Sequence, residues 1–490
     1  MVMKTIVIGL DGASFDLIEP WIDRGKLPNL HRLITEGVRG RLNSCLPPVT
    51  SPNWKCYSTG KNPGKLGIFW WENIDFKNRR ITISGPPLQT KEIWDYISES
   101  GGKVGIINMP LTYPPKKVNG FMIAGGPDAR PDNFTYPREL ESRLKKEFNY
   151  KVHPTVRSNW KQSKQAVEEA LALMEARFSV AKVLAQEYEA DFLHLTTFYI
   201  NVLHHDLWDD EIVERAWQVL DASIGVLLQE FKECNVIVMS DHGSNEIKQV
   251  FYINTWLKKQ GYLETSSSLY IPKLLYKLGL NEESLYRMSQ RLHLSQIVGK
   301  LVPQKILNNI PSAIGTVELE HKADKVVWDR TKALGSGQGP LYINPANSGL
   351  REELIGKLEN LTNPLTGSRI ARKVYKKEDV YRGEFLSEAP DIIIDQYPHT
   401  HIRGSLGNRD VFEQPKRWRA ENTVEGIFIA WGPGFKQGIE ASNVSILDLA
   451  PTILHQMNIP VPDDMDGRVL SEIFREGSEP ATREIKYRQI

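Results

Sequence analysis

Short apolar runs recur along this chain at intervals that leave room for a helix between them. Five of them lie at residues 5–10, 103–108, 191–197, 235–240 and 426–430. Brief runs rich in Val, Ile and Leu are typical of strands that are buried on both faces of a parallel sheet. Helical patterns separate several of these runs. Because strands alternate with helices, the sequence predicts an α/β fold around a central, mostly parallel sheet.

Polar residues follow several of these predicted strands. Asp11 directly follows the first run, Asp241 and His242 follow the fourth, and Asn201 and His205 come shortly after the third. Ligands of open α/β sheets bind beyond the carboxyl ends of the strands, so these residues are candidates for one site. The alternative for Asp11 is an N-cap of the helix that follows it.

A stiff turn at residues 46–54 presents two adjacent hydroxyl groups. Three prolines flank Thr50 and Ser51. Because proline fixes φ and removes an amide donor, this segment is predicted to be a turn that leads into a helix. Backbone N–H groups at a helix N-terminus attract anions, so a hydroxyl there could attack a phosphoryl or acyl centre. The alternative is a proline-rich connector with an incidental threonine.

These residue types together indicate metal-assisted phosphoryl chemistry. Carboxylate oxygens combined with imidazole suit zinc or manganese. A metal beside a hydroxyl lowers the pKa of that hydroxyl and makes it a nucleophile. Phosphoryl transfer otherwise asks mainly for positioning and charge neutralisation. We therefore expect Thr50 to act next to a divalent ion.

Several motifs in their order along the chain resemble the alkaline phosphatase superfamily, most closely its type I phosphodiesterase/nucleotide pyrophosphatase branch. The motifs are Asp11-Gly12, residues 48–54 with Ser58-Thr59-Gly60, and Ser240-Asp241-His242-Gly243, with further similarity at residues 254–257, 389–391, 426–433, 448–454 and 464–468. The resemblance covers most of the chain. It implies an alkaline-phosphatase-like α/β sandwich with helices on both faces of the sheet.

The same resemblance implies roles for individual residues. One metal ion would be held by Asp11, Thr50, Asp241 and His242, and all four are present. Thr50 would attack phosphorus and form a phospho-threonine intermediate. Asn53 would donate to a nonbridging phosphate oxygen.

A second metal site departs from the family pattern. Its ligands would fall on Asn201, His205 and Asn422, and only His205 keeps the expected residue type. An amide oxygen brings no charge, so affinity for zinc should fall there, and we expect one tight ion and a doubtful second site. Five nearby residues could compensate or could simply be polar loop residues: His204, Asp206, His399, His401 and Asp410.

The 490 residues are predicted to form one catalytic domain with two inserts. Residues 266–314 are expected to be an inserted helical cap, and residues 128–159 a smaller surface insert. The net charge of +1 favours neither nucleic acid nor a membrane surface. Three cysteines and the lack of a signal segment or membrane span predict a cytoplasmic protein. The resemblance implies a small phosphoester or phosphodiester as the substrate.

Three functions are compatible with these residues. The first is a metal-dependent phosphodiesterase or related phosphoester hydrolase that uses Thr50. The second is a single-metal phosphoryl or phosphodiester-group transferase with the same nucleophile. The third is a binding or scaffold protein whose metal site is impaired at Asn201 and Asn422. The complete ligand set around Thr50 favours catalysis.

Overall fold

The computed structural model describes residues 3–83, 90–155, 164–208, 211–266, 322–416 and 418–490. Its first strand, β1 (Thr5–Leu10), forms where the apolar run predicts it, and all six of its residues are buried. A strand with no exposed residue needs cover on both faces, so β1 belongs in the centre of a sheet.

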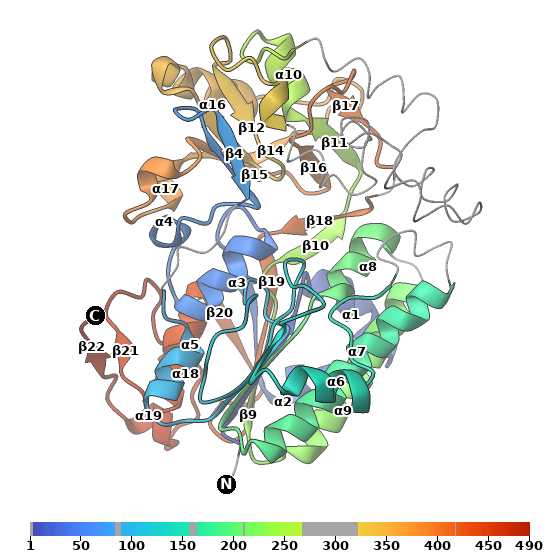
Figure 1. Cartoon of the computed structure of the whole chain (residues 1–490), viewed down its shortest axis with the longest axis vertical. Helices are drawn as coiled ribbons and strands as arrows, with labels where there is room; N and C mark the ends of the chain where they lie inside the picture. The colour runs from blue at the N-terminus through green and yellow to red at the C-terminus, as the bar shows by residue number, and fades with distance from the viewer. Residues whose placement is uncertain (1–2, 84–89, 156–163, 209–210, 267–321, 417) are drawn as a thin grey trace.

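A nine-stranded sheet organises the larger part of the described chain (Figure 1). Its strands lie in the order β20 (Ile439–Ser445), β2 (Val38–Asn43), β19 (Glu425–Trp431), β9 (Asn235–Met239), β1, β8 (Phe192–Thr197), β5 (Val104–Ile107), β6 (Gly120–Ile123) and β7 (Thr135–Tyr136). Only β19 and β7 run antiparallel to their neighbours among these described strands. The prediction of a mostly parallel central sheet is confirmed.

Helices cover both faces of this sheet (Figure 1). One face carries α1 (Phe15–Asp23), α2 (Pro28–Glu36), α7 (Lys164–Glu187), α8 (Tyr199–Leu207) and α9 (Glu211–Glu230), and the other carries α3 (Thr50–Thr59), α5 (Ile93–Glu99) and α18 (Leu449–Gln456). In β1, Ile6 and Ile8 pack toward the first set of helices and Val7 packs toward the second. Successive side chains of a strand point to opposite faces of the sheet, so they belong alternately to two separate hydrophobic cores.

A smaller antiparallel sheet lies in the upper part of Figure 1. Its strands are β12 (Ala333–Gly335), β13 (Pro340–Ile343), β15 (Ile392–Gln396) and β14 (Ala371–Lys376), and they share a hydrophobic cluster with α10 (Ile253–Lys259) and α16 (Arg351–Glu359). A short ladder of β10 (Gly243–Glu246) and β18 (Ala420–Thr423) lies between the two sheets. This ladder begins one residue after His242.

The remaining described elements are short. They are α4 (Pro63–Leu66), β3 (Glu72–Asp75), β4 (Arg80–Ile83), α6 (Leu140–Glu147), β11 (Gln249–Tyr252), η3 (Pro345–Leu350), α17 (Lys377–Val380), η4 (Leu386–Glu388), β16 (Thr400–Arg403), β17 (Phe412–Glu413), η5 (Ile446–Asp448), β21 (Val461–Pro462), η6 (Ser471–Ile473), α19 (Glu479–Thr482) and β22 (Tyr487–Arg488). None of the described helices combines the length and the apolar content that crossing a membrane requires.

The two predicted inserts have different outcomes. The structure describes residues 128–155 of the predicted surface insert, where β7 extends the main sheet and α6 buries Leu140 and Leu144 in its core. The other residues of α6 are half-buried or exposed, so this part of the chain lies on the surface and covers the edge of the main sheet with only a few apolar side chains. Apart from Ser266, the predicted cap at residues 266–314 lies outside the described residues.

Two segments that lack apolar runs hold short helices or strands. Residues 375–381 include the end of β14 and all of α17. The polar stretch at residues 399–419 contains β16 and β17, which pair with β11. The buried strand predicted at residues 426–430 is β19, and the partly exposed β20 follows it at the edge of the main sheet. Edge strands are short and partly polar, so their sequences lack the apolar run of a central strand.

Candidate active site

The candidate site begins where two adjacent parallel strands end. β1 pairs with β9 in a register that sets Gly9 opposite Met239. Asp11 follows β1, and Asp241 and His242 follow β9, so the parallel pairing brings all three to the same edge of the sheet. Their side chains are fully buried. The N-cap of α1 is Ser14, so the alternative role for Asp11 as that cap is wrong.

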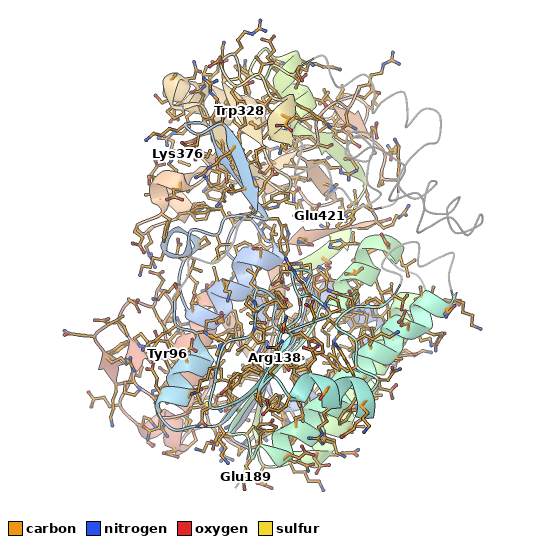
Figure 2. The ribbon with its side chains drawn as sticks, in the orientation of Figure 1. Tyr96, Arg138, Glu189, Trp328, Lys376 and Glu421 are labelled. Carbon is orange, nitrogen blue, oxygen red and sulfur yellow. The ribbon has the colours of Figure 1, made fainter. Side chains whose placement is uncertain are left out.

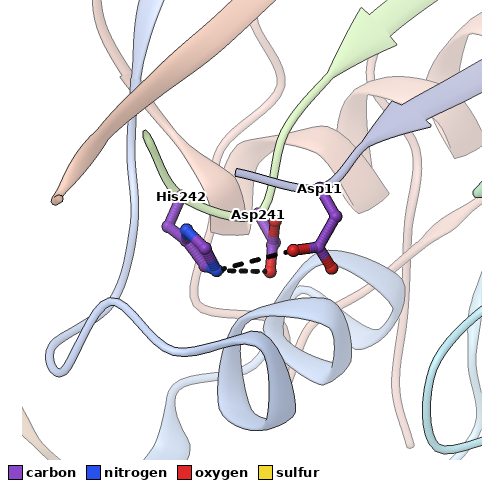
Figure 3. Close-up of side chains that lie close together, drawn as sticks. All are labelled: Asp11, Asp241 and His242. Atoms are coloured by element: carbon purple, nitrogen blue, oxygen red, sulfur yellow. Dashed lines mark ion pairs between the residues drawn. The ribbon is translucent and has the colours of Figure 1, made fainter. Parts of the chain in front are cut away.

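Asp11, Asp241 and His242 form one compact group, called here the Asp–Asp–His cluster (Figure 3). His242 Nε2 lies 3.1 Å from Asp241 Oδ2 and 3.8 Å from Asp11 Oδ1. The backbone N–H of Gly12 donates to Asp241 Oδ1 at 3.2 Å. His242 Nδ1 donates to the carbonyl of Gly243 at 2.9 Å, which leaves the lone pair of Nε2 directed at the carboxylates.

Burial controls the electrostatics of this cluster. Burial is the largest cause of the strongly raised pKa of Asp11, and the charge of Asp241 raises it further. Burial raises the pKa of Asp241 to about 8 and lowers the pKa of His242. Two adjacent buried carboxyl groups cannot both be ionised at neutral pH unless a cation compensates their charge.

The cluster has the composition and the spacing of a site for a divalent cation. Its three ligand atoms all lie within 4.8 Å of one another, and no second such group of acids, histidines and cysteines occurs in the described part of the chain. Among the described residues, Asp241 Oδ2 has no well-aligned hydrogen-bond donor, and the burial of Asp241 raises its pKa more than the Thr50 side chain lowers it. A buried carboxylate oxygen without a donor is costly, and a metal ion would remove that cost. Two carboxylates and one imidazole suit zinc or manganese.

Thr50 lies beside the cluster, as the turn predicts. It is the first residue of α3, only 4% of its surface is exposed, and its Oγ1 lies 3.3 Å from His242 Nε2. The helix extends to Thr59 and ends at Gly60, whose φ of 67° is the left-handed conformation that glycine adopts most readily. In the first turn of α3, Pro52 has no N–H group and the N–H of Asn53 donates to the carbonyl of Val49, so the N–H groups of Thr50 and Ser51 are the ones that could receive an anion.

Asn53 holds the turn that carries Thr50. Its Oδ1 accepts from the backbone N–H of Cys45 at 2.7 Å, and its Nδ2 donates to the carbonyls of Pro47 and Val49 at 3.1 and 3.0 Å. The amide is thus engaged with the backbone that leads into α3. Its predicted donation to a phosphate oxygen has no support from this geometry.

Two N–H donors to Asp11 complete the described site. Trp54 Nε1 donates to Asp11 Oδ2 at 3.0 Å, and Asn201 Nδ2 donates to Asp11 Oδ1 at 2.8 Å. Sequence reasoning missed Trp54. A signal was available, because Trp54 follows Thr50 by four residues and therefore lies on the same face of a helix.

The predicted second set of ligands is only partly assembled. Asn201 turns its N–H group toward Asp11. His205 lies one turn further along α8, and its Nδ1 donates to the carbonyl of Ala420 at 2.7 Å. The lone pair of its other ring nitrogen, Nε2, takes no part in that hydrogen bond. Asn422 pairs with Ser244 across the β10–β18 ladder, and within the described ranges its Oδ1 has no hydrogen-bond partner. These three residues do not form a cluster of charged ligands.

The five possible substitutes do not join the Asp–Asp–His cluster. His204 accepts from the indole of Trp217 at 3.0 Å and stacks on that ring. His399 donates to the carbonyl of Glu246, and His401 pairs with the carboxylate of Glu421, which lies between the two sheets in Figure 2. Asp206 is half-buried and Asp410 is exposed.

Comparisons with known proteins place the chain in a family. The family model for type I phosphodiesterases and nucleotide pyrophosphatases matches residues 5–420. A search of curated proteins found no match. Among solved structures, phosphonoacetate hydrolase from Sinorhizobium meliloti 1021, in complex with phosphonoformate, is similar, with a TM-score of 0.57 at 15% sequence identity.

This structural match covers 91% of our chain and 94% of the hydrolase. At such low identity the match shows the shared fold, and it confirms the predicted alkaline-phosphatase-like α/β sandwich. The family match extends over most of the chain and confirms the resemblance seen in its motifs. The chain therefore belongs to the type I phosphodiesterase/nucleotide pyrophosphatase family of the alkaline phosphatase superfamily.

Proposed function

We propose that this protein is a metal-dependent phosphoester hydrolase of the phosphodiesterase type, in which Thr50 is the nucleophile. The observation that carries this proposal is the position of Thr50 Oγ1, 3.3 Å from His242 Nε2 at the edge of the Asp–Asp–His cluster. The family match supports phosphoester hydrolysis as the reaction class. The substrate that we propose is a small phosphodiester or related phosphoester.

The ion would be held by Asp11, Asp241 and His242, with the Thr50 oxygen as a further ligand. When bound, a zinc or manganese ion lowers the pKa of the threonine hydroxyl and neutralises charge on the phosphoryl group. The buried carboxylates supply the negative charge that such an ion requires. The N-terminal turn of α3 contributes backbone N–H groups where phosphoryl oxygens would lie.

The reaction has two displacement steps. In the first, Thr50 Oγ forms a bond to phosphorus while the bond from phosphorus to the leaving oxygen breaks. The hydroxyl proton passes to solvent, and the leaving oxygen is protonated by water. In the second, water attacks phosphorus, the bond to Oγ breaks, and the threonine hydroxyl takes up a proton.

Exchange of Thr50 tests the nucleophile. The Thr50→Ala variant should lose at least about 10³-fold in kcat for bis-p-nitrophenyl phosphate, because no other hydroxyl takes its place. Ser51→Ala is the matched control. Ser51 is the adjacent, fully buried hydroxyl and has no hydrogen-bond partner within the described chain. Wild-type turnover by Thr50→Ala would refute the assignment.

The number of bound ions is a second prediction. We expect one tightly bound divalent ion per chain, because Asn201 contributes an N–H donor to Asp11 and no charge to a second site. Elemental analysis of purified protein should therefore give about one equivalent. Asp241→Asn should lose that ion, whereas Asp329→Asn, at an exposed ion pair, should keep it. Two equivalents of zinc in the wild type would contradict a one-ion site.

A single-metal transferase is the second candidate function. The contact from Asn201 to Asp11 favours it, since a second ion that would activate water is then not expected. An alcohol would replace water in the second displacement. Phosphorus NMR of reactions with added glycerol separates the two functions, because transfer yields a glycerol ester and hydrolysis yields only the free acid.

The predicted cytoplasmic location remains a proposal. It rests on the three cysteines, which the structure shows as free thiols and which fit a reducing compartment.

A further inference from the structure

Asp11 receives one N–H group on each of its two carboxylate oxygens. Trp54 Nε1 lies 3.0 Å from Oδ2, and Asn201 Nδ2 lies 2.8 Å from Oδ1. Asp11 and Trp54 are fully buried, and Asn201 is 2% exposed. The two donors come from different layers of the molecule, because α3 and α8 pack on opposite faces of the sheet. The carboxylate is therefore held from both sides.

Two glycines beside Asp11 make room for these donors. A Cβ atom on Gly9 would lie 2.4 Å from Cη2 of Trp54. A Cβ atom on Gly12 would lie 2.3 Å from Oδ1 of Asn201, and Gly12 has a φ of +69°. Real Cβ atoms do not approach so closely, so any larger residue at either position would displace a donor. The backbone around Asp11 thus accommodates both contacts.

Each donor is also fixed on its far side. The ring of Trp54 meets Tyr57 and His194 edge to face, with centroids 5.9 and 6.0 Å away. Ser244 Oγ, which donates to the carbonyl of Gly12 at 2.7 Å, lies 3.4 Å from Asn201 Oδ1. Rigid donors hold a carboxylate in one orientation.

We infer that Trp54 and Asn201 are positioning residues that orient Asp11 for a divalent cation. This inference rests on the proposed metal site. Trp54 has a further effect, since it belongs to the same helix as Thr50 and so fixes the position of α3 relative to Asp11. Partners of this kind typically contribute 10-fold to 100-fold in metal affinity, which is about 1.4–2.7 kcal/mol.

The chain offers a matched control for Trp54. Trp94 on α5 is also a fully buried indole in the same hydrophobic cluster and packs against His194 at 6.3 Å. Its Nε1 has no hydrogen-bond partner among the residues that the structure describes. Trp54→Phe and Trp94→Phe therefore remove similar volume, but only the first removes a hydrogen bond to Asp11.

The test is zinc affinity of the whole protein, measured by competition with a chromophoric chelator. Trp54→Phe should bind zinc about 10-fold to 100-fold more weakly than the wild type, and Trp94→Phe within about twofold of it. Asn201→Leu, which keeps the size of the side chain but removes its N–H group, should weaken zinc binding in the same range. If Trp54→Phe does not fold by circular dichroism, Asn201→Leu carries the test alone.

The outcomes distinguish this inference from the proposed function. Zinc binding by both variants at the wild-type affinity would overturn the positioning roles and leave the metal site standing. Equal weakening in Trp54→Phe and Trp94→Phe would also overturn the role of Trp54, because loss of packing would explain both. If the wild type bound no divalent ion, the proposed metal-dependent function would itself fail.

Discussion

Asp241 couples the stability of the metal-free protein to pH. Burial raises its pKa to about 8 in the folded state, and an unfolded aspartate titrates near 3.9. Between these values the folded state binds more protons than the unfolded state, so the free energy of unfolding falls as pH rises. Asp11, whose pKa burial raises, acts in the same direction. Four buried histidines act in the opposite direction up to about one pH unit above the ordinary histidine pKa of about 6.5, because burial lowers their pKa values. They are His194, His204, His205 and His242.

Comparison with Asp241→Asn isolates the contribution of Asp241, because the buried histidines are common to both proteins. Without metal, the free energy of unfolding in urea of the wild type, taken relative to that of Asp241→Asn, should fall by up to about 2 kcal/mol from pH 6.5 to 8. Asp11 keeps a raised pKa in the variant, because burial is the largest cause of its shift, so the variant loses only the part of the fall that Asp241 contributes. Saturating zinc should remove it as well, since the ion compensates both carboxylates. An equal fall in Asp241→Asn would assign the pH dependence to other groups.

Elements of the main sheet and their polar ends could be predicted from the sequence. β1 and β9 consist mostly of apolar, β-branched residues, and such runs have few alternatives to a buried strand. The edge strand β20 and the short strands β16 and β17 were missed, because polar residues interrupt them and their pairing depends on neighbours that are distant in the sequence.

In the candidate site, too, some residues could be predicted from the sequence and some contacts could not. Asp11, Asp241 and His242 were predictable because adjacent parallel strands must end together, and Thr50 because prolines mark its turn. The contact between Asn201 and Asp11 was not, since spacing along α8 does not say which atom of an amide faces the carboxylate. The donation of Asn53 to phosphate was implied by the family resemblance alone, and in the structure its amide bonds to the backbone of the turn.

At the scale of the whole molecule, the edge of the main sheet that carries the Asp–Asp–His cluster is surrounded by segments that are held together by ion pairs and hydrogen bonds. Asp466, in the C-terminal region, connects its own segment to two others. Its carboxylate contacts Lys65 in α4 at 2.8 Å and accepts from the backbone N–H of Asn62, in the same segment, at 2.8 Å. It also contacts Arg382, which follows α17, at 2.9 Å. Burial raises the pKa of Asp466, but these partners lower it further than burial raises it, so the group is ionised. Helix α3, which begins at Thr50, thus continues into a segment that is tied to the small-sheet region and to the C-terminal region.

Loss of this junction should destabilise the protein. Asp466→Asn should lower the free energy of unfolding by about 1–2 kcal/mol, because two charge-assisted contacts are lost while Lys65 and Arg382 keep access to water. Asp329→Asn is the control, since both members of its ion pair with Arg79 are more than half exposed, and it should change stability by less than about 0.5 kcal/mol. Urea unfolding of both variants at neutral pH measures the difference. Equal small effects would mean that Asp466 is dispensable and that packing alone holds the three segments together.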